Sequence, residues 1–335
     1  MKRIMLFIMT NIAIIGAGLS GLTAATKLNQ HANITVFEKA GGVGGRMATR
    51  HAAPYSFDHG AQFFLARTAE FKAFISPMLT QGIIAPWDGC FAEFENKKII
   101  LKRQWVEDKP HYVGVPGMNA IAKYLSRDLN VRLDVKVQSI TKKNDKWQLD
   151  DDQGKTLGEY DWVIPTTPAQ QASELLPSSL SCYPKLDEIK MKACFSLMLG
   201  FEHDLSLAFD AALVRGNDIS WISVNSTKPG RGKPFCLLVH STNQWADDHL
   251  YDGSDQVMEY LSSQTSEVIG FDLSGAAHKS LHGWHFANIG KQTGETHFLD
   301  MEQQIAVCGD WFIQGRVEAA FTSGFDAATK LIRAL

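Results

Sequence analysis

A glycine-rich motif near the amino terminus constrains the fold of this 335-residue chain more than any other feature. The motif, GAGLSG over residues 16–21, follows an apolar run expected to be a buried strand (Asn11–Ile15) and precedes a helix expected over Ser20–Asn29. In such a unit the first glycine permits a tight turn, the second lets the backbone approach a pyrophosphate, and the third lets helix and strand pack closely. The phosphate lies at the amino terminus of the helix. The residues expected to contact a dinucleotide are Gly16, Gly18, Leu19, Ser20 and Gly21.

A carboxylate and a second glycine loop follow the next expected strand, Asn33–Phe37. Glu38 ends this strand, where an acidic side chain accepts the ribose hydroxyls of a dinucleotide. The loop Gly41–Arg46 holds four glycines and one arginine. It suits a backbone pressed against a pyrophosphate, with Arg46 offering its guanidinium, and it is not part of the plain NAD fingerprint. The alternative is a flexible surface loop with a solvated arginine.

The length and hydrophobic pattern of the chain predict an α/β protein of two domains. With 335 residues, 45% of them hydrophobic, the chain is long enough to bury two cores. We expect a Rossmann-like nucleotide-binding domain assembled from residues 9–70, 110–170 and 295–335. An inserted α+β substrate domain, built on a mixed or antiparallel sheet, is expected over residues 71–109 and 171–294.

The remaining elements are expected from apolar periodicity and turn residues. Expected strands are Phe91–Leu101 with a turn at Asn96-Lys97, Val131–Thr141, Trp147–Leu149, Asp161–Ile164, Phe195–Phe201, Ala212–Val224, Pro234–His240, His278–Phe286 and Ile305–Cys308. Expected helices are Glu70–Leu79 ending near Pro77, Ala120–Leu129, one amphipathic helix within Tyr251–Ile269, and a last helix with Val317, Phe321, Phe325, Ala328 and Ile332 on its buried face.

Charge, cysteine usage and hydropathy narrow the class of protein. A net charge of −3 without a basic cluster argues against a nucleic-acid partner. The five cysteines are scattered without CxxC spacing, so neither a disulfide framework nor a metal site is expected, and a reducing compartment fits better. No segment approaches the ~20 apolar residues of a membrane span, so we expect a cytoplasmic protein without a membrane partner. Met1–Ile8 is interpreted as a dispensable extension before an alternative start at Met9.

The glycine motif, Glu38 and the GGVGGR loop together resemble the FAD-binding signature of the flavin amine oxidase superfamily. Further stretches are similar to its bacterial renalase branch. These are Arg46–Arg50, Asp58–Phe64, Ala66-Arg67, Pro116–Met118, Cys308–Trp311, Gly315–Glu318 and Ser323-Gly324. The resemblance spans nearly the whole chain and implies that FAD is bound without a covalent bond.

The resemblance also implies which residues complete the FAD site. Asp310 would bind the ribityl chain or a phosphate-side hydroxyl, and a helix cap or turn carboxylate is its alternative role. The helix from Val317 would direct its amino terminus at the pyrimidine edge of the flavin, where its partial positive charge stabilises an anionic reduced flavin. Besides the glycine motif, the implied FAD-binding residues are Glu38, Lys39, Gly44, Gly45, Arg46, His59, Gly60, Ala61, Gln62, Val137, Thr166, Asp310, Arg316, Val317 and Glu318.

The same resemblance implies a substrate site. Gln62, His240 and Trp284 would be the catalytic residues, and Arg67, His240 and Trp284 would bind the substrate. On the residues alone, Gln62 is as easily a strand-edge group. His240 is as easily a strand-end histidine that is hydrogen-bonded to backbone.

Several neighbouring residues receive other interpretations. Phe63 and Phe64 are expected in the core, and Arg103 and Arg231 on solvated faces. Gly283 and His285 stand where relatives carry arginine, and Asn288 stands where they carry proline. These departures put the substrate in more doubt than the flavin.

The renalase resemblance implies an FAD-dependent oxidase. It would take hydride from the 2- or 6-dihydro isomers of NAD(P)H and pass the electrons to O2, giving β-NAD(P)+ and hydrogen peroxide. Such a donor needs no general base, and the sequence offers no clear one. Two alternatives stay open: a flavin amine oxidase or desaturase acting on another small donor, and a non-catalytic FAD-binding module. No sequence feature specifies an oligomeric state.

Overall fold

The structure of the chain, a computed structural model, describes residues 9–95, 97–106 and 109–335. These residues divide into two units, each assembled from segments that are separated in the sequence. Unit 1 holds the described residues up to Gly45, with Leu125–Lys190 and Lys291–Leu335. Unit 2 holds Arg46–Tyr124 and Met191–Gly290. The expected extension Met1–Ile8 lies outside the described residues.

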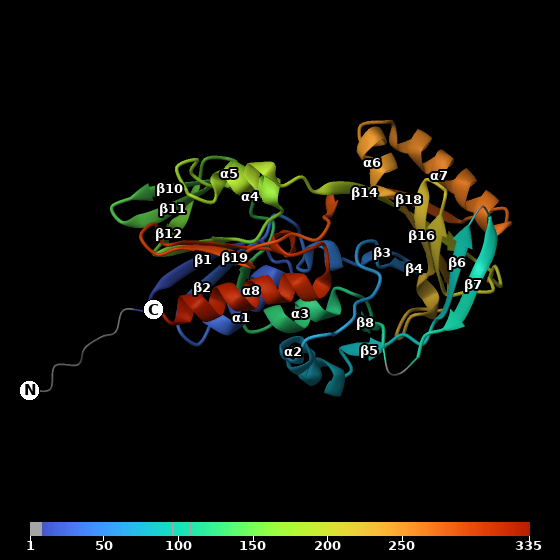
Figure 1. Ribbon diagram of the computed structural model, residues 1–335, viewed down its shortest axis with the longest axis horizontal. Helices are drawn as coiled ribbons and strands as arrows, with labels where there is room; N and C mark the ends of the chain where they lie inside the picture. Colours follow the sequence, from blue (N-terminus) through green and yellow to red (C-terminus); the bar gives the residue numbers. More distant parts are fainter. Residues whose placement is uncertain (1–8, 96, 107–108) are drawn as a thin grey trace, which may run out of the picture. The chain divides into compact units, whose positions relative to one another are not determined.

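Unit 1 is built on a six-stranded sheet of short apolar strands (Figure 1). The strand order is β19-β20-β13-β1-β2-β9, and every neighbouring pair is parallel except β19 with β20. The bounds are β1 (Asn11–Ile15), β2 (Asn33–Phe37), β9 (Asn130–Arg132), β13 (Trp162–Pro165), β19 (His297–Asp300) and β20 (Ile305–Cys308). Ile12 and Ile14 are fully buried, because a central parallel strand is covered on both faces.

Helices α1 (Leu19–Leu28) and α8 (Val317–Ile332) of unit 1 lie side by side (Figure 1). A Cβ atom at Gly324 would lie 2.3 Å from the Ser20 carbonyl oxygen, so only glycine permits this approach. Unit 1 also contains α4 (Ala169–Leu175), α5 (Tyr183–Glu188), the 3-10 helix η3 (Asp310–Phe312) and an antiparallel sheet of β10 (Val137–Lys143), β11 (Lys146–Asp151) and β12 (Thr156–Tyr160).

Unit 2 is built on a seven-stranded sheet with the order β18-β14-β17-β16-β15-β6-β7. Only β15 and β6 pair in parallel. The bounds are β6 (Cys90–Glu95), β7 (Lys98–Gln104), β14 (Lys192–Phe201), β15 (Ala211–Arg215), β16 (Ile219–Val224), β17 (Phe235–Ser241) and β18 (His278–Asn288). Side chains alternate between the two faces of each strand, so each face has its own neighbours.

The two faces of the unit 2 sheet are covered differently. One face forms the larger apolar core with helices α6 (Asn243–His249) and α7 (Ser254–Ile269). The other face packs on the short hairpin of β3 (Arg50–Ala52) and β4 (Tyr55–Phe57). The remaining elements are η1 (Gly45–Met47), α2 (Ala69–Thr80), α3 (Ala120–Ser126), η2 (Asn225–Thr227) and the strand pair β5 (Ile84–Pro86) and β8 (Tyr112–Gly114).

Several expected elements have other bounds in the structure. The expected strand over Val131–Thr141 is wrong, because Asp134 has a φ of +56° and separates β9 from β10. The single strand expected over Ala212–Val224 is also wrong, since a turn with Gly216 at φ +69° divides it into β15 and β16.

The expected helices differ from the observed ones mainly at their ends. Helix α3 ends at Ser126, short of the expected Leu129, and α2 continues through Pro77 to Thr80. On α8 the buried face includes Phe321, Ala328 and Leu331, whereas the expected Phe325 and Ile332 are half-buried. Lys97 has the positive φ of a turn residue, and its expected partner Asn96 lies outside the described residues.

The expected α/β class with a Rossmann-like domain is confirmed by the sheet of unit 1. The expected domain ranges differ from the two units: residues 46–70 and 110–124 belong to unit 2, and 171–190 to unit 1. The division into an FAD-binding domain and a substrate domain stays a prediction. Within the described ranges, no helix is long and apolar enough to cross a membrane.

Candidate functional site

The first glycine loop of unit 1 is a tight turn that excludes side chains. Gly16 has a φ of +111°, which side chains rarely adopt. A Cβ atom at Gly21 would lie 2.1 Å from the Gly16 carbonyl oxygen and 2.6 Å from the Thr166 hydroxyl. That hydroxyl donates to the carbonyls of Ile15 and Gly16 at 3.1 and 2.9 Å. Thr166 therefore supports the loop from the neighbouring strand.

The amino terminus of α1 remains open beside this turn. Gly18 is the N-cap and offers no side chain to the first turn, which holds no acidic residue. A Cβ atom at Gly18 would meet nothing within 4 Å. The second glycine loop lies alongside, because the Gly44 amide donates to the Ala17 carbonyl at 2.9 Å. The amides of the first turn at such a helix end fit an anionic diphosphate.

Glu38 connects the end of β2 to both neighbouring loops. Its Oε2 atom accepts from the Ala17 amide at 2.8 Å, and its Oε1 atom accepts from the Ala40 amide at 2.9 Å. Each carboxylate oxygen can accept a second hydrogen bond, which suits the ribose hydroxyls. The predicted role of Glu38 thus fits its position, and the neighbouring Lys39 is exposed.

The carboxy-terminal motif lies in unit 1 between β20 and α8. Asp310 is 4% exposed and begins η3. Arg316 is the N-cap of α8 and forms no side-chain cap hydrogen bond, and Val317 and Glu318 begin the helix. The predicted residue Val137 is buried at the start of β10. Unit 1 therefore contains the predicted FAD-binding residues outside the 46–62 segment.

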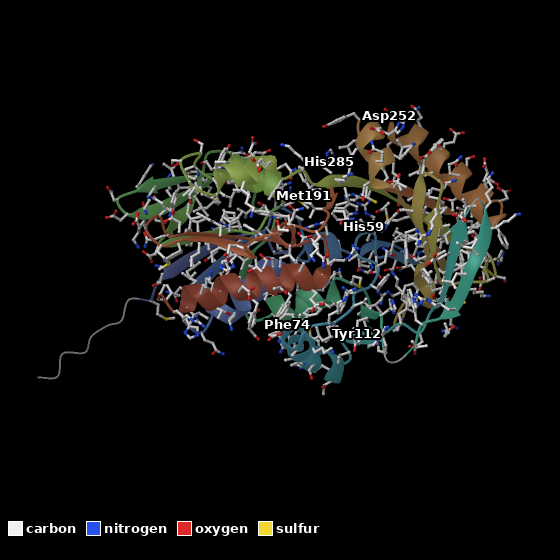
Figure 2. The ribbon with its side chains drawn as sticks, viewed as in Figure 1. His59, Phe74, Tyr112, Met191, Asp252 and His285 are labelled. Carbon is white, nitrogen blue, oxygen red and sulfur yellow. The ribbon has the colours of Figure 1, made fainter. Side chains whose placement is uncertain are left out.

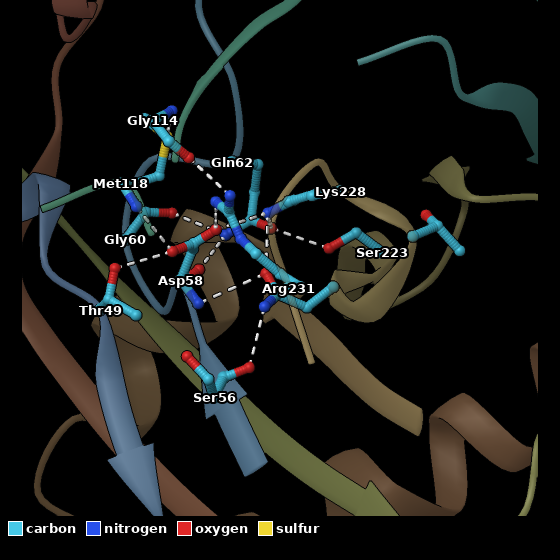
Figure 3. A network of polar contacts seen from close by, with 12 residues as sticks. Thr49, Ser56, Asp58, Gly60, Gln62, Gly114, Met118, Ser223, Lys228 and Arg231 are labelled. Carbon is cyan, nitrogen blue, oxygen red and sulfur yellow. Dashed lines mark hydrogen bonds and ion pairs between the residues drawn. The ribbon is translucent and has the colours of Figure 1, made fainter. Parts of the chain in front are cut away.

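A buried charge cluster lies in unit 2 (Figure 3). The side chains of Asp58 and Lys228 are 0% exposed. Asp58 Oδ2 accepts from Lys228 Nζ at 3.3 Å and from an Arg231 guanidinium nitrogen. Asp58 Oδ1 accepts from the Thr49 hydroxyl at 2.8 Å and from the Met118 amide at 2.9 Å. Two cations therefore share one carboxylate.

The expectation that Arg231 is solvated is wrong, since its side chain is 1% exposed. A buried carboxylate requires a partner of opposite charge, and Asp58 has two. Burial alone would raise the pKa of Asp58, but Lys228 and Arg231 outweigh it and bring the pKa below its ordinary value. Burial lowers the pKa of Lys228 to about 8, against the opposite effect of Asp58. At neutral pH both groups remain charged.

Gln62 is held by this cluster through every polar atom of its side chain. Its Nε2 atom donates to the carbonyls of Asp58 and Gly60. Its Oε1 atom accepts from the Ser223 hydroxyl at 2.8 Å and from Lys228 Nζ at 3.1 Å. The orientation of the amide is therefore fixed by protein atoms, and Gln62 holds the 58–62 segment against β16.

The 58–62 segment is also held at Gly60 and Ala61. The Ala61 amide donates to the Arg46 carbonyl at 2.9 Å. A Cβ atom at Gly60 would lie 2.0 Å from that same oxygen. The Arg46 guanidinium donates to the Ala287 carbonyl on β18 at 3.1 Å. The structure thus brings these predicted residues together in unit 2, whereas Arg67 is exposed before α2.

Rings gather around His59, which lies in the interior of unit 2 in contrast to the exposed Asp252 (Figure 2). The ring centroids of His59 and Trp284 lie 5.2 Å apart in a stacked arrangement. The ring of His282 lies 5.0 Å from His59 and 4.3 Å from Trp284. The His59 carbonyl accepts from Trp284 Nε1 at 2.8 Å and from the Ser196 hydroxyl at 2.6 Å.

Three histidines of unit 2 are weak bases. Burial is the largest cause that lowers the pKa of His59, His240 and His282 to about 4. Neighbouring positive groups add to the effect, including Arg50 beside His59 and His282. All three imidazoles are therefore neutral at neutral pH.

A row of polar side chains crosses four adjacent strands of the unit 2 sheet. Ser196 on β14 pairs in register with His282 on β18 and with His240 on β17, and His240 pairs with Trp221 on β16. Residues that pair directly across strands point to the same face. The Ser196 bond to the His59 carbonyl shows that the 58–62 segment lies over this face.

An aromatic cluster that the sequence analysis did not identify lies at one end of this row. Phe63 contacts the rings of Trp105, His111 and Trp221, with centroid distances of 5.2, 4.8 and 5.6 Å. Phe91 lies 6.2 Å from Trp221. Phe63 is half-buried in this cluster, whereas Phe64 is in the core as expected. The members of this aromatic cluster come from distant segments of the sequence and share no motif.

The unusual residues on β18 have a local explanation. A Cβ atom at Gly283 would lie 3.3 Å from the ring of Phe195 on β14, so a long side chain would have to displace that ring. His285 is exposed. Instead of the expected arginines, position 283 therefore has a glycine that leaves room for the Phe195 ring, and position 285 has a histidine exposed to solvent.

Two family models match the chain. A model described as NAD(P)-binding Rossmann-like domain matches residues 14–76, and one described as flavin containing amine oxidoreductase matches residues 67–332. Among curated proteins, coproporphyrinogen III oxidase of Mycobacterium bovis is 38% identical over 69 residues, which are 19% of this chain and 15% of that protein. The same enzyme of Mycobacterium tuberculosis matches to the same extent. The chain thus spans about 15% of the length of these curated relatives.

Solved structures match over almost the whole chain. A protein assigned as a protoporphyrinogen oxidase, from Exiguobacterium sp. 255-15, has a TM-score of 0.79 at 12% identity, covering 97% of this chain and 99% of that one. Cyclohexylamine oxidase from Brevibacterium oxydans IH-35A has a TM-score of 0.73 at 13% identity with the same coverage. At such identity the likeness shows a shared fold.

Proposed function

The chain belongs to the flavin containing amine oxidoreductase family, and from this premise we propose that it is a renalase-like oxidase of dihydronicotinamide isomers. Its substrate would be a 2- or 6-dihydro isomer of NAD(P)H, a small-molecule dinucleotide, with O2 as the second substrate. With one proton taken up from the solvent, the products would be β-NAD(P)+ and hydrogen peroxide.

FAD is the cofactor of this flavin-dependent oxidoreductase. In unit 1 its diphosphate fits the open end of α1 at Gly18, and its ribose fits the carboxylate of Glu38. When bound, FAD supplies the hydride acceptor and the route of electrons to O2. The protein has to bind, orient and shield the reacting groups.

The observation that carries the proposal is the neutral state of the histidines in unit 2. His59, His240 and His282 have pKa values of about 4, so they accept protons poorly near pH 7. Among the described residues near them, Asp58 is ionised but committed to Lys228 and Arg231. A dihydropyridine releases hydride without losing a proton first. The part of unit 2 around these histidines holds its aromatic rings in fixed positions and offers no strong general base among the described residues. Such surroundings suit a dihydropyridine donor.

The residues of unit 2 would act by orientation. The Gln62 amide is fixed by four contacts and holds the 58–62 segment. Trp284 is fixed by its bond to the His59 carbonyl. A fixed surface brings one side of a nicotinamide ring to the hydride acceptor, and a displacement of about 1 Å costs ~100-fold in rate.

The direct test is flavin reduction under anaerobic stopped-flow conditions. We expect the 2- or 6-dihydro isomers to bleach the oxidised flavin at least ~100-fold faster than ordinary 4-dihydro NADH or catecholamines. Re-admitted oxygen should then restore the yellow colour and yield hydrogen peroxide. Rapid bleaching by 4-dihydro NADH at the same rate would contradict the proposal.

An amine oxidase is the second candidate, and the aromatic cluster around Phe63 favours it. Aromatic faces attract cations, as a protonated amine requires. A panel of primary amines, including cyclohexylamine and putrescine, belongs in the same experiment. Bleaching of the flavin by amines but not by the dinucleotide isomers would show that the protein is an amine oxidase. Failure of every donor would favour a non-catalytic FAD-binding role.

A further inference from the structure

Two ring nitrogens on the polar row of unit 2 are buried without a partner. Trp221 Nε1 and His240 Nε2 have no hydrogen bond to any protein atom. A buried polar group without a partner destabilises a folded protein, so each such group needs an explanation. The two residues pair directly between β16 and β17, so their side chains lie on the same face.

The chemical characters of these two nitrogens are complementary. The indole nitrogen of Trp221 is a donor only. Burial lowers the pKa of His240, and the His59 backbone opposes this effect, as a carbonyl that accepts from the other ring nitrogen would. In a neutral imidazole one nitrogen donates and the other accepts, which leaves His240 Nε2 as an acceptor. The pair therefore offers one donor beside one acceptor.

We propose that Trp221 and His240 bind the primary carboxamide of the substrate ring. Trp221 Nε1 donates to the amide oxygen, and the amide NH2 group donates to His240 Nε2. This assignment rests on the proposed function, and it adds Trp221 as a residue that selects the substrate. The carboxamide fixes which edge of the dihydropyridine points away from the sheet.

The surroundings of the pair suit a flat ring that carries such an amide. Trp221 lies 5.6 Å from Phe63 and 6.2 Å from Phe91 by ring centroids. On the other side of His240, the row continues through Ser196, whose hydroxyl is already committed to the His59 carbonyl. Among the described residues around the row, Nδ1 of His59 and Nδ1 of His111 are also buried without a partner, and the two ring nitrogens of Trp221 and His240 are the ones that lie on the row itself.

The test compares two donors that differ only in this group. One is the 2- or 6-dihydro isomer of NADH, and the other is the same isomer of nicotinic acid adenine dinucleotide, which carries a carboxylate. Anaerobic flavin reduction at increasing concentrations gives the dissociation constant and the limiting rate for each. We expect the wild-type enzyme to bind the amide at least tenfold more tightly, because a carboxylate has no proton to donate to His240.

The variants separate the two contacts. Trp221→Phe keeps an aromatic ring but removes the N–H, so both donors should bind about tenfold more weakly. His240→Phe removes the acceptor, so only the amide should lose affinity, and the discrimination should disappear. His240→Gln restores an acceptor oxygen and should restore the discrimination. Trp245→Phe, on the opposite face of the sheet beside Phe195, is the matched control and should change neither constant.

The outcomes distinguish this inference from the proposed function. If the wild-type enzyme is not reduced by the dihydro isomers at all, the proposed function fails. If it is reduced, but Trp221→Phe with normal flavin content binds the amide like wild type, the carboxamide assignment is wrong. Equal wild-type affinity for amide and acid would also overturn it and would indicate that ordered water satisfies the two nitrogens.

Discussion

Unit 1 and unit 2 present binding surfaces of opposite construction. In unit 1 the surface is backbone: the open helix end at Gly18 and the turn at Gly16, with Glu38 as its main side chain. In unit 2 it is a network of side chains around Asp58 and His59 from many segments. The difference teaches that the surface predicted to bind FAD depends on local backbone shape, whereas the surface predicted to bind the substrate depends on long-range contacts of side chains.

The largest expected effect tests whether unit 2 depends on its buried charge. Asp58→Asn leaves Lys228 and Arg231 buried without an anion, and breaking a buried pair in this way costs about 3–5 kcal/mol. Denaturant unfolding at pH 7 would measure the loss of unfolding free energy. Asp88→Asn, at an exposed position of unit 2, is the control and should change little. A loss below about 1 kcal/mol would show that the cations find other partners.

The next prediction tests whether unit 1 depends on the shape of its backbone. Gly21→Ala places a methyl group against the Gly16 carbonyl, and overpacking of this kind costs about 1–3 kcal/mol or more. We expect the purified variant to lose most of its flavin, as measured by absorbance after gel filtration. Gly275→Ala, where a Cβ atom would meet nothing within 4 Å, is the control. Full flavin content in Gly21→Ala would show that flavin binding does not require the close contact at Gly21.

A smaller effect is expected at Glu38, the main side chain of the surface of unit 1. Glu38→Ala removes the acceptor of the Ala17 and Ala40 amides and of the ribose hydroxyls. Bonds to a charged group are worth about 1.5–3 kcal/mol, so FAD should bind at least ~10-fold more weakly. Titration of the apoprotein with FAD measures the dissociation constant. Glu38→Gln, which keeps one acceptor oxygen, should lie between wild type and alanine.

The smallest effect concerns pH and the neutral histidines of unit 2. The unfolded chain takes up a proton at His240 below about pH 6.5, but the folded protein does so only near pH 4. Stability from this group is therefore lost as the pH falls through this window, by about 2 kcal/mol at pH 5. His240→Gln should lose less stability than wild type between pH 7.5 and pH 5. The exposed His203→Gln should behave like wild type.

Sequence reasoning reached unit 1 more completely than unit 2, for a physical reason. The turn at Gly16, the close approach at Gly21 and the carboxylate of Glu38 depend on neighbours within one βαβ unit, so they leave a local pattern. Arg231 lies in a Lys-Pro-Gly-Arg stretch that is typical of a solvated turn, and only its long-range contact with Asp58 explains its burial. Asp58 follows strand β4 directly, but this position alone is no signal, because Glu38 also follows a strand and accepts from backbone amides.

Trp221 is missing from the predicted site residues for the same physical reason. Trp221 fits the alternating pattern of an ordinary strand. Neither its position in that pattern nor the residues beside it in the sequence distinguish it from a core tryptophan. Its importance follows from its register with His240, which no single segment contains. His240 and Trp284 were reached only through a family resemblance, and their roles stay predictions.

The close approach of Gly324 to Ser20 has a consequence for how the chain is made. Helix α1 is synthesised before both segments of unit 2, and α8 is synthesised after them. The sheet of unit 1 likewise waits for β20, which pairs with β13, and the chain passes through unit 2 twice before that. During synthesis helix α1 remains without its neighbour α8, and strand β13 without its neighbour β20, until the segment from Lys291 onward has been made. The nascent chain should therefore depend on protection from aggregation until that segment has been made.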